Sequence, residues 1–283
     1  MNSSLKVASI SGLILNAILF VGKFTIGILS NSIAVISDSF NSFTDIFSST
    51  AIYISVKISG TKADEKHQFG HRRAEPIAGL IVAIFSGIVG FEVLKESVLK
   101  FFEPHEHSIG TLSIVVLSVN IVVKIFMSVY FKRIGTKHNS PAILASSIDS
   151  RNDVLSVSVA LIGVVGAYFG YPKFDETAGT IIALIILYSG YRIGKENIDY
   201  LMGISAKHEV VKSITTQVQS VEGVHGIKEI RTHYVGHFIQ TEISILVEHN
   251  LPSKMASDIA RNVKSKVEEL ELIDNASVII ETV

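Results

Sequence analysis

The chain has 283 residues, of which 48% are hydrophobic and only 18% are charged, and its mean hydropathy is +0.44. These values lie on the membrane side of ordinary soluble composition. The formal net charge of −1 gives no field that would attract nucleic acid, so we expect no nucleic-acid partner. Cysteine is absent, which excludes disulfides and thiolate zinc sites, so any bound metal must use oxygen or imidazole ligands.

Apolar stretches long enough to cross about 30 Å of hydrocarbon recur along the chain before residue 203. They predict six transmembrane helices, at residues 7–29, 33–56, 76–101, 111–131, 143–169 and 177–202. The second and fifth stretches are the least hydrophobic and carry several Ser residues. Small hydroxyl residues allow close helix approach, so we expect these two helices inside the bundle. Lys23 and Lys124 are expected to snorkel or to form pairs within it.

Basic residues in the linkers predict the orientation. The linkers after the second and fourth stretches carry Lys62, Lys66, Arg72, Arg73, Lys132, Arg133 and Lys137, whereas the other three carry one Lys between them. By the positive-inside rule, both termini are cytoplasmic. We therefore expect a multi-pass protein embedded in a lipid bilayer, in the plasma (inner) membrane of a prokaryote.

From Glu209 onward the pattern becomes that of a soluble domain of about eighty residues. It predicts a helix at 210–218, strands at 224–231 and 238–247, a helix at 252–270 and a strand at 276–282. This order predicts a small α+β ferredoxin-like domain, an open antiparallel sheet with helices on one face and an edge or face free for dimerisation. We expect a transmembrane transport domain at 1–203 and a cytoplasmic regulatory and dimerisation domain at 204–283.

Two pairs of polar residues interrupt the second and fifth apolar stretches. Asn41 and Asp45 are four residues apart, as are Asp149 and Asp153, so each pair lies on one face of a helix. An Asp at the centre of a spanning helix costs roughly 2.5–3.5 kcal/mol on insertion scales. Two facing helices could bring three carboxylates and an amide oxygen to one metal ion. The alternative, hydrogen-bonded bridging of helices, is disfavoured because three acidic groups at bilayer depth repel without a cation or proton.

The chain resembles the cation diffusion facilitators, a six-helix family that exports divalent metal ions in exchange for protons. The matching segments are Ser32 through Asp45, His67 through Glu75, and Asp149 through Asp153. The resemblance implies a secondary transporter and not an enzyme. It also implies a transport site made of Asn41, Asp45, Asp149 and Asp153.

The ligand types bear on the transported ion. Zinc-transporting members of the family usually carry His at the first position of one or both pairs, where this chain has Asn41 and Asp149. An all-oxygen set suits harder ions, and the combination resembles the manganese branch. We expect a homodimer that exports Mn²⁺ or Fe²⁺ in exchange for protons and needs no cofactor. The alternatives are a Zn²⁺ or Co²⁺ exporter of the same family and a transport-inactive metal-sensing membrane scaffold.

Other candidate ligands lie outside the predicted helices. Asp64, His67 and His71 could present one oxygen and two nitrogens from one helical turn. The resemblance implies zinc there, while the alternative is a purely structural turn before the third helix. In the C-terminal domain the candidate ligands are His233, His237, Glu242, His249 and Glu281, with exposed polar turn residues as the alternative interpretation. Gly203 stands where the family often has an Asp that forms a salt bridge with the loop.

Overall fold

The computed structural model describes residues 3–68, 70–102, 111–137, 141–171, 173–236 and 238–282. The chain divides into two compact units. The helical unit comprises Met1–Ile52 and Ile81–Gly194, and the mixed unit comprises Tyr53–Leu80 and Lys195–Val283.

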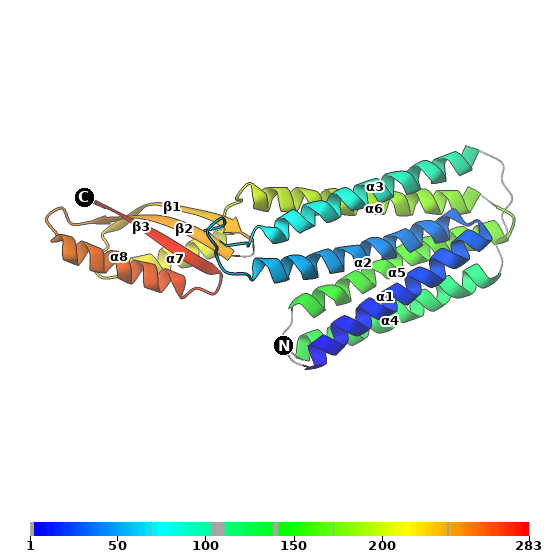
Figure 1. Cartoon of the computed structure of the whole chain (residues 1–283), viewed down its shortest axis with the longest axis horizontal. Coiled ribbons are helices and arrows are strands. Elements are labelled where there is room, and N and C mark those ends of the chain that lie inside the picture. Colours follow the sequence, from blue (N-terminus) through cyan, green and yellow to red (C-terminus); the bar gives the residue numbers. More distant parts are fainter. Residues whose placement is uncertain are drawn as a thin grey trace. The chain divides into compact units, whose positions relative to one another are not determined.

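Six long helices account for the six apolar stretches (Figure 1). They are α1 (Ser3–Ser30), α2 (Ile33–Ser59), α3 (Ala74–Phe102), α4 (Thr111–Lys137), α5 (Pro141–Tyr168) and α6 (Lys173–Leu201). Within the described residues, five of them contain a segment long and apolar enough to cross a membrane. The sixth, α2, falls short because its Ser, Thr and Asp residues lower its hydropathy. The chain is therefore an α-helical, multi-pass membrane protein.

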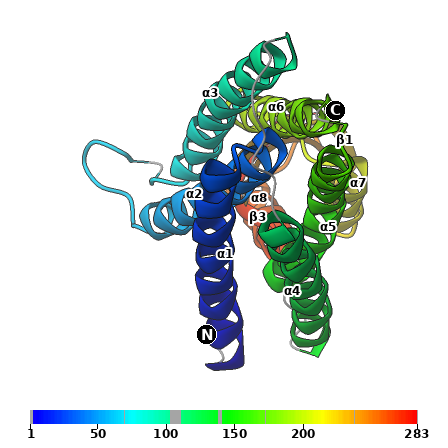
Figure 2. The same ribbon diagram turned by 90° about the vertical axis from the view of Figure 1, so that its right-hand side faces the viewer.

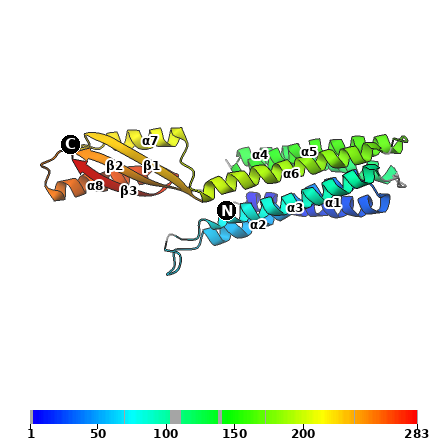
Figure 3. The same cartoon turned by 90° about the horizontal axis from the view of Figure 1, so that it is seen from above.

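Close packing of small and aliphatic residues forms the interior of the helical unit. Helix α4 packs along α5 and along α1 (Figure 2), and α3 lies against α6 (Figure 3). A Cβ atom on Gly90 of α3 would lie only 2.9 Å from Leu187 Cγ of α6, so the glycine permits this approach. The central cluster consists of Ala34, Val35, Leu117, Val157, Ala160, Val164, Ala178, Ile182 and Ile186.

Hydroxyl side chains line the inner faces of α2 and α5, as the sequence predicted. Ser37 and Ser42 on α2 and Ser147 and Ser150 on α5 are buried. Ser37 donates to the Ile33 carbonyl at 2.6 Å, four residues earlier in its own helix. Back-bonding of this kind satisfies hydroxyls where no water is present, so the polar stretch of α2 is compatible with a membrane interior.

A glycine with a left-handed backbone follows the last turn of helix α6. Gly203 has φ +78°, and the Ile204 N–H donates to the Asp199 carbonyl at 2.9 Å. A left-handed residue after the last helical turn is the common way to satisfy terminal carbonyls, and glycine adopts it without strain. The backbone thus gives a local reason for Gly203 at a position where the family often has Asp.

The mixed unit contains the predicted order of helix, strand, strand, helix and strand. The elements are α7 (His208–Gln219), β1 (Gly226–Val235), β2 (Phe238–Val247), α8 (Ser253–Glu268) and β3 (Ile273–Thr282), and the sheet order is β1-β2-β3. Helices α7 and α8 cover one face of the sheet (Figure 1), where Ile214, Ile243 and Val263 are fully buried. This is the small α+β domain that the sequence predicted.

The expectation of a wholly antiparallel sheet is wrong for one strand pair. Strands β1 and β2 are antiparallel, with Arg231 opposite Glu242, but β2 and β3 run parallel, with Glu242 opposite Ser277. Helix α8 connects β2 to β3, and a helical crossover returns the chain in the same direction. The sheet is therefore mixed.

Candidate metal centres

The two polar pairs lie on α2 and α5 of the helical unit. Asn41 and Asp45 are one turn apart on α2, and Asp149 and Asp153 are one turn apart on α5. The Asn41 amide donates from Nδ2 to Asp153 Oδ1 at 3.4 Å. The structure thus brings one residue of each pair into contact. This hydrogen bond links α2 to α5.

Asp45 carries an unsatisfied carboxylate oxygen. Its side chain is half-buried, and Oδ2 has no hydrogen-bond partner among the described residues. Asp153, Lys124 and Asp149 lie close enough to act on it electrostatically. A buried oxygen left without a partner is costly, so this atom is available to bind a cation; Asp38 Oδ1 on the same helix also has no hydrogen-bond partner among the described residues.

The three carboxylates do not converge as a closed metal site. Asp149 is exposed on the surface of this single chain. Among the described residues, Asp45, Asp149 and Asp153 do not form a group whose ligand atoms all lie within 4.8 Å of one another. The structure therefore places Asn41, Asp45 and Asp153 near one another and leaves Asp149 at the edge of the constellation.

Two buried lysines contact this region, and neither snorkels. Lys23 is 0% exposed and donates to Asp38 Oδ2 and to Ser42 Oγ, each at 2.7 Å. Lys124 is 1% exposed, forms an ion pair with Asp153 and donates to Asn16 Oδ1 at 2.9 Å. Of the two expectations for these lysines, pairing inside the bundle is correct. Lys124 adds a site residue that the sequence analysis did not assign, although a lysine within an apolar stretch was a signal.

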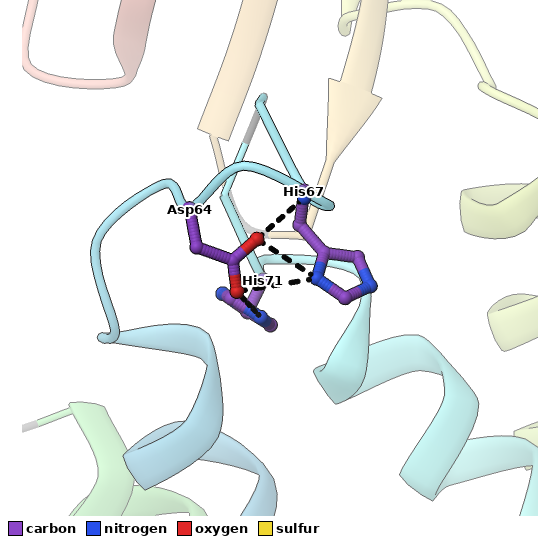
Figure 4. A group of neighbouring side chains, drawn as sticks. All are labelled: Asp64, His67 and His71. Atoms are coloured by element: carbon purple, nitrogen blue, oxygen red, sulfur yellow. Dashed lines mark hydrogen bonds and ion pairs between the residues drawn. The ribbon is translucent and has the colours of Figure 1, made fainter.

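Asp64, His67 and His71 gather in the segment between α2 and α3 (Figure 4). His67 Nδ1 lies 3.2 Å from Asp64 Oδ1, and His71 Nε2 lies 3.4 Å from Asp64 Oδ2. The two imidazole rings are 4.5 Å apart between centroids. One ligand atom from each residue lies within 4.8 Å of the others, so the oxygen and two nitrogens can bind one ion and would supply three of the four ligands of a tetrahedral zinc site.

The three loop residues do not share a helical turn, contrary to the expectation. Residues 61–68 and 70–73 form turns and bends. The Asp64 carboxylate accepts hydrogen bonds from the backbone N–H groups of Lys66, at 3.0 Å, and His67, at 2.5 Å. An Asp that binds the backbone just ahead of it favours a turn over a helix. The hydrogen bond from His67 lowers the pKa of the Asp64 carboxyl group below its ordinary value, which favours the anionic form that a metal needs.

The candidate ligands of the C-terminal domain remain separate where the structure describes them. His233 on β1 is opposite Gln240, and His249 is exposed just after β2. Glu242 is exposed on β2, and Glu281 forms an ion pair with Lys228 at 2.5 Å. His237 lies outside the described residues. Within the described part of this domain, these side chains form no group of three that could hold an ion.

Arg72 connects the same loop to the sheet within the mixed unit. It forms an ion pair with Asp274 on β3, and its guanidinium carbon lies 4.1 Å from the centroid of the Phe238 ring on β2. Asp274 is far from Arg72 in sequence, so no local pattern could have indicated this contact. We call this pair of interactions the Arg72 clamp.

Comparison with family models gives two matches that together span most of the chain. The model for the cation efflux transmembrane domain matches residues 9–202. The model for the cation efflux protein cytoplasmic domain matches residues 206–281.

Individual proteins match over nearly the full length. An uncharacterized transporter of Methanocaldococcus jannaschii is 32% identical, covering 95% of this chain and 95% of its own. The manganese efflux system protein MneP of Bacillus subtilis is 31% identical, covering 93% and 91%. The magnetosome protein MamB of Magnetospira sp. is 29% identical, covering 87% and 84%. Among solved structures, a variant of the MamM C-terminal domain is 25% identical and covers 28% of this chain and 99% of that domain, with a TM-score of 0.27.

Proposed function

Because the chain belongs to the cation efflux family, the cation diffusion facilitators, we propose that it exports Mn²⁺ from the cytoplasm in exchange for protons. It is a membrane transporter of metal cations. The observation that carries the choice of Mn²⁺ is the donor set on α2 and α5, which contains only oxygen ligands and includes the unsatisfied Asp45 oxygen. We infer that Asn41, Asp45, Asp149 and Asp153 bind the transported ion.

Ligand chemistry favours a hard ion. Carboxylate and amide oxygens suit Mn²⁺, whereas Zn²⁺ gains more from imidazole and thiolate. The similarity to a protein named for manganese efflux, MneP, supports the same ion. Fe²⁺ is close in ligand preference and is the second choice. Intrinsic affinity orders Zn²⁺ above Mn²⁺ at most sites, so selectivity must come from geometry and supply.

Charge is the reason for proton exchange. Asp45, Asp149 and Asp153 carry three negative charges against the one positive charge of Lys124, so the site keeps a net negative charge once the ion departs, and unpaired charge at a buried site is expensive. Protons taken up from the opposite side supply that compensation, so release of the metal is coupled to proton entry. The helical pair α2 and α5 carries all four ligands and is the moving part of this cycle.

We also propose roles for the two domains and for the loop cluster Asp64, His67 and His71. Residues 1–203 form the transport domain, and residues 204–283 form a cytoplasmic domain through which two chains dimerise. The name of the family model that matches 206–281 refers to a dimer, and one face of the sheet is free of helices (Figure 1). Asp64, His67 and His71 fit a resident Zn²⁺, because one oxygen and two nitrogens lie within range of a single ion. When bound, that ion would cross-link the loop.

Metal flux into vesicles tests the proposal. Inverted vesicles with wild-type protein should accumulate Mn²⁺ when their interior is acidic and should stop when an ionophore collapses the proton gradient. Asp45→Ala should abolish uptake. Thr50→Ala is the matched control on α2, because this exposed residue only hydrogen-bonds within its own helix. Uptake that survives Asp45→Ala, or that does not depend on the proton gradient, would refute the mechanism.

A separate measurement tests the proposed dimer. Light scattering coupled to chromatography of the purified protein should give the mass of two chains.

A further inference from the structure

A buried lysine lies at the centre of the transport region. Lys124 on α4 is 1% exposed, and among the described residues its ammonium hydrogen-bonds to the side chains of Asn16 on α1 and Asp153 on α5. An ammonium at bilayer depth costs free energy, so buried lysines in membrane helices are rare and usually belong to ion pairs or functional sites. Its main partner is one of the four residues that we assign to the transported ion.

Both oxygens of Asp153 are already engaged in this structure. Oδ1 accepts from the Asn41 amide at 3.4 Å, and Oδ2 is held by Lys124. A divalent ion that binds Asp153 must therefore replace the ammonium at Oδ2 or share the carboxylate with it. Two cations on one carboxylate repel each other, so the lysine competes with the ion.

The formal charges of the assigned ligands and of the Lys124 ammonium determine which ion charge the site can neutralise. Three carboxylates and one ammonium give a net charge of −2, which one divalent ion neutralises. Lys23 and Asp38, the neighbouring buried pair, cancel each other. Arg192 also acts on Asp149; both side chains are exposed, so solvent screens this interaction, and the sum counts only the assigned ligands and the ammonium that contacts one of them.

We propose that Lys124 is a specificity-determining residue, a fixed positive charge that holds Asp153 while the site is empty, yields to the arriving ion and matches the site to a double charge. The inference rests on the proposed function. The lysine lowers the affinity for the ion, which favours release, and it penalises an ion of higher charge. Removing the ammonium should leave a site of charge −3 that binds Mn²⁺ more tightly and prefers a trivalent ion.

Direct binding to purified full-length protein tests this role, with Mn²⁺ and La³⁺ as probes. Lys124→Gln removes the charge and keeps a polar side chain, and Lys124→Arg restores the charge. Lys23→Gln combined with Asp38→Asn is the matched control, because it neutralises the other buried pair without touching the assigned ligands. Mn²⁺ flux in vesicles is measured on the same variants.

Lys124→Gln should bind Mn²⁺ about tenfold more tightly, as loss of an adjacent like charge would give. La³⁺ should displace Mn²⁺ from it at a La³⁺-to-Mn²⁺ ratio about tenfold lower than in the wild type, and the maximal flux should fall. Lys124→Arg and the control pair should keep the wild-type ratio. An unchanged or weaker Mn²⁺ affinity with an unchanged ratio in Lys124→Gln would show a structural role only and overturn the inference. If the wild-type protein binds Mn²⁺ without dependence on Asp45, or binds none, the proposed function fails with it.

Discussion

At the residue scale, two aspartates of α2 differ in their ion pairing, although each has one carboxylate oxygen without a hydrogen-bond partner among the described residues. Asp38 receives the Lys23 ammonium and, at 3.5 Å, the Asn120 amide on the same oxygen. Its buried ion pair with Lys23 fits a role in helix packing. Asp45 instead forms no ion pair among the described residues, and four charged groups, those of Asp153, Lys124, Asp149 and Lys23, act on it electrostatically. Both residues sit seven positions apart on α2, so acidity alone does not identify the ligand.

Asn41 should set the preference for Mn²⁺ over Zn²⁺. Replacing it by His puts an imidazole in place of one of the four assigned oxygen ligands. An imidazole suits Zn²⁺ better than Mn²⁺. We expect Asn41→His to shift the Zn²⁺-to-Mn²⁺ preference toward Zn²⁺ by about tenfold or more in competition binding. Ser49→His is the control, since it puts an imidazole at an exposed position of the same helix. An equal shift in both variants, or none in Asn41→His, would refute the oxygen-site argument.

The loop cluster should hold one ion per chain and release it in acid. Protons compete with metal for the imidazoles of His67 and His71, whereas the lowered pKa of Asp64 keeps its carboxylate ionised. Zinc binding to the loop should therefore weaken as the pH falls from about 7.5 to about 5.5. Equilibrium dialysis of the variant His67→Ala with His71→Ala should show one ion fewer at the higher pH. His225→Ala, an exposed histidine outside the cluster, should retain it, and an unchanged count in the double variant would exclude the site.

At the element scale, the start of α2 depends on a residue of α6. The Asp175 carboxylate, fully buried, accepts from Ser32 Oγ at 2.5 Å and from the Ile33 and Ala34 N–H groups at 2.6 and 3.3 Å. A carboxylate that accepts from the first N–H groups of a helix satisfies donors that have no partner in the helix, and it complements the positive end of the helix dipole. Asp175 thus fixes the end of the helix that carries Asn41 and Asp45.

Removing this cap should destabilise the protein without changing which ion it binds. Asp175→Ala leaves buried N–H donors unpaired, so we expect a loss of at least about 1–2 kcal/mol, the range for helix caps. Thermal unfolding in detergent should show a lower midpoint, with an unaltered ratio of Mn²⁺ to Zn²⁺ affinity. Thr177→Ala is the control, because its hydroxyl bonds only within α6. A midpoint equal to that of the control would contradict the capping role.

Periodicity and composition predicted every long helix and the order of elements in the mixed unit. These features depend on local patterns, such as the alternation of 238–247, which the structure reproduces as β2. Asn41 and Asp45 stood out because they interrupt an apolar helix. Contacts between distant residues were not predictable. The Lys124–Asp153 pair, the Asp175 cap and the Arg72 clamp each require the relative placement of elements, and the parallel β2–β3 pair follows from the path of α8.

The Arg72 clamp should restrain the loop that carries the three candidate zinc ligands. An ion pair with Asp274 and a stacked Phe238 ring together are expected to contribute about 1 kcal/mol. Arg72→Ala should therefore accelerate tryptic cleavage after Lys66, an exposed loop residue, as followed by mass spectrometry. Arg73→Ala, at an exposed neighbouring position, is the matched control. Equal cleavage rates in the two variants would show that the clamp does not order the loop.

At the scale of the whole molecule, orientation follows from where positive charge and soluble mass are found. Lys62 and Lys66 lie in the segment between α2 and α3, and the elements α7 through β3 follow α6. With six crossings both lie on the side of the N-terminus, and the positive-inside rule supports our proposal that this side is the cytoplasm. Export then means movement from the side of the loop cluster toward the side of the α5–α6 connection.

Because the chain has no cysteine, single cysteines can report this orientation without a background. Lys62→Cys and Lys207→Cys should react with a membrane-impermeant maleimide only after intact cells are opened, since both exposed positions belong to the cytoplasmic side. Tyr171→Cys, exposed between α5 and α6, should react in intact cells. Retained Mn²⁺ flux in each variant controls for misfolding. Labelling of Lys62→Cys in intact cells would show the opposite orientation and would contradict the direction of transport that we propose.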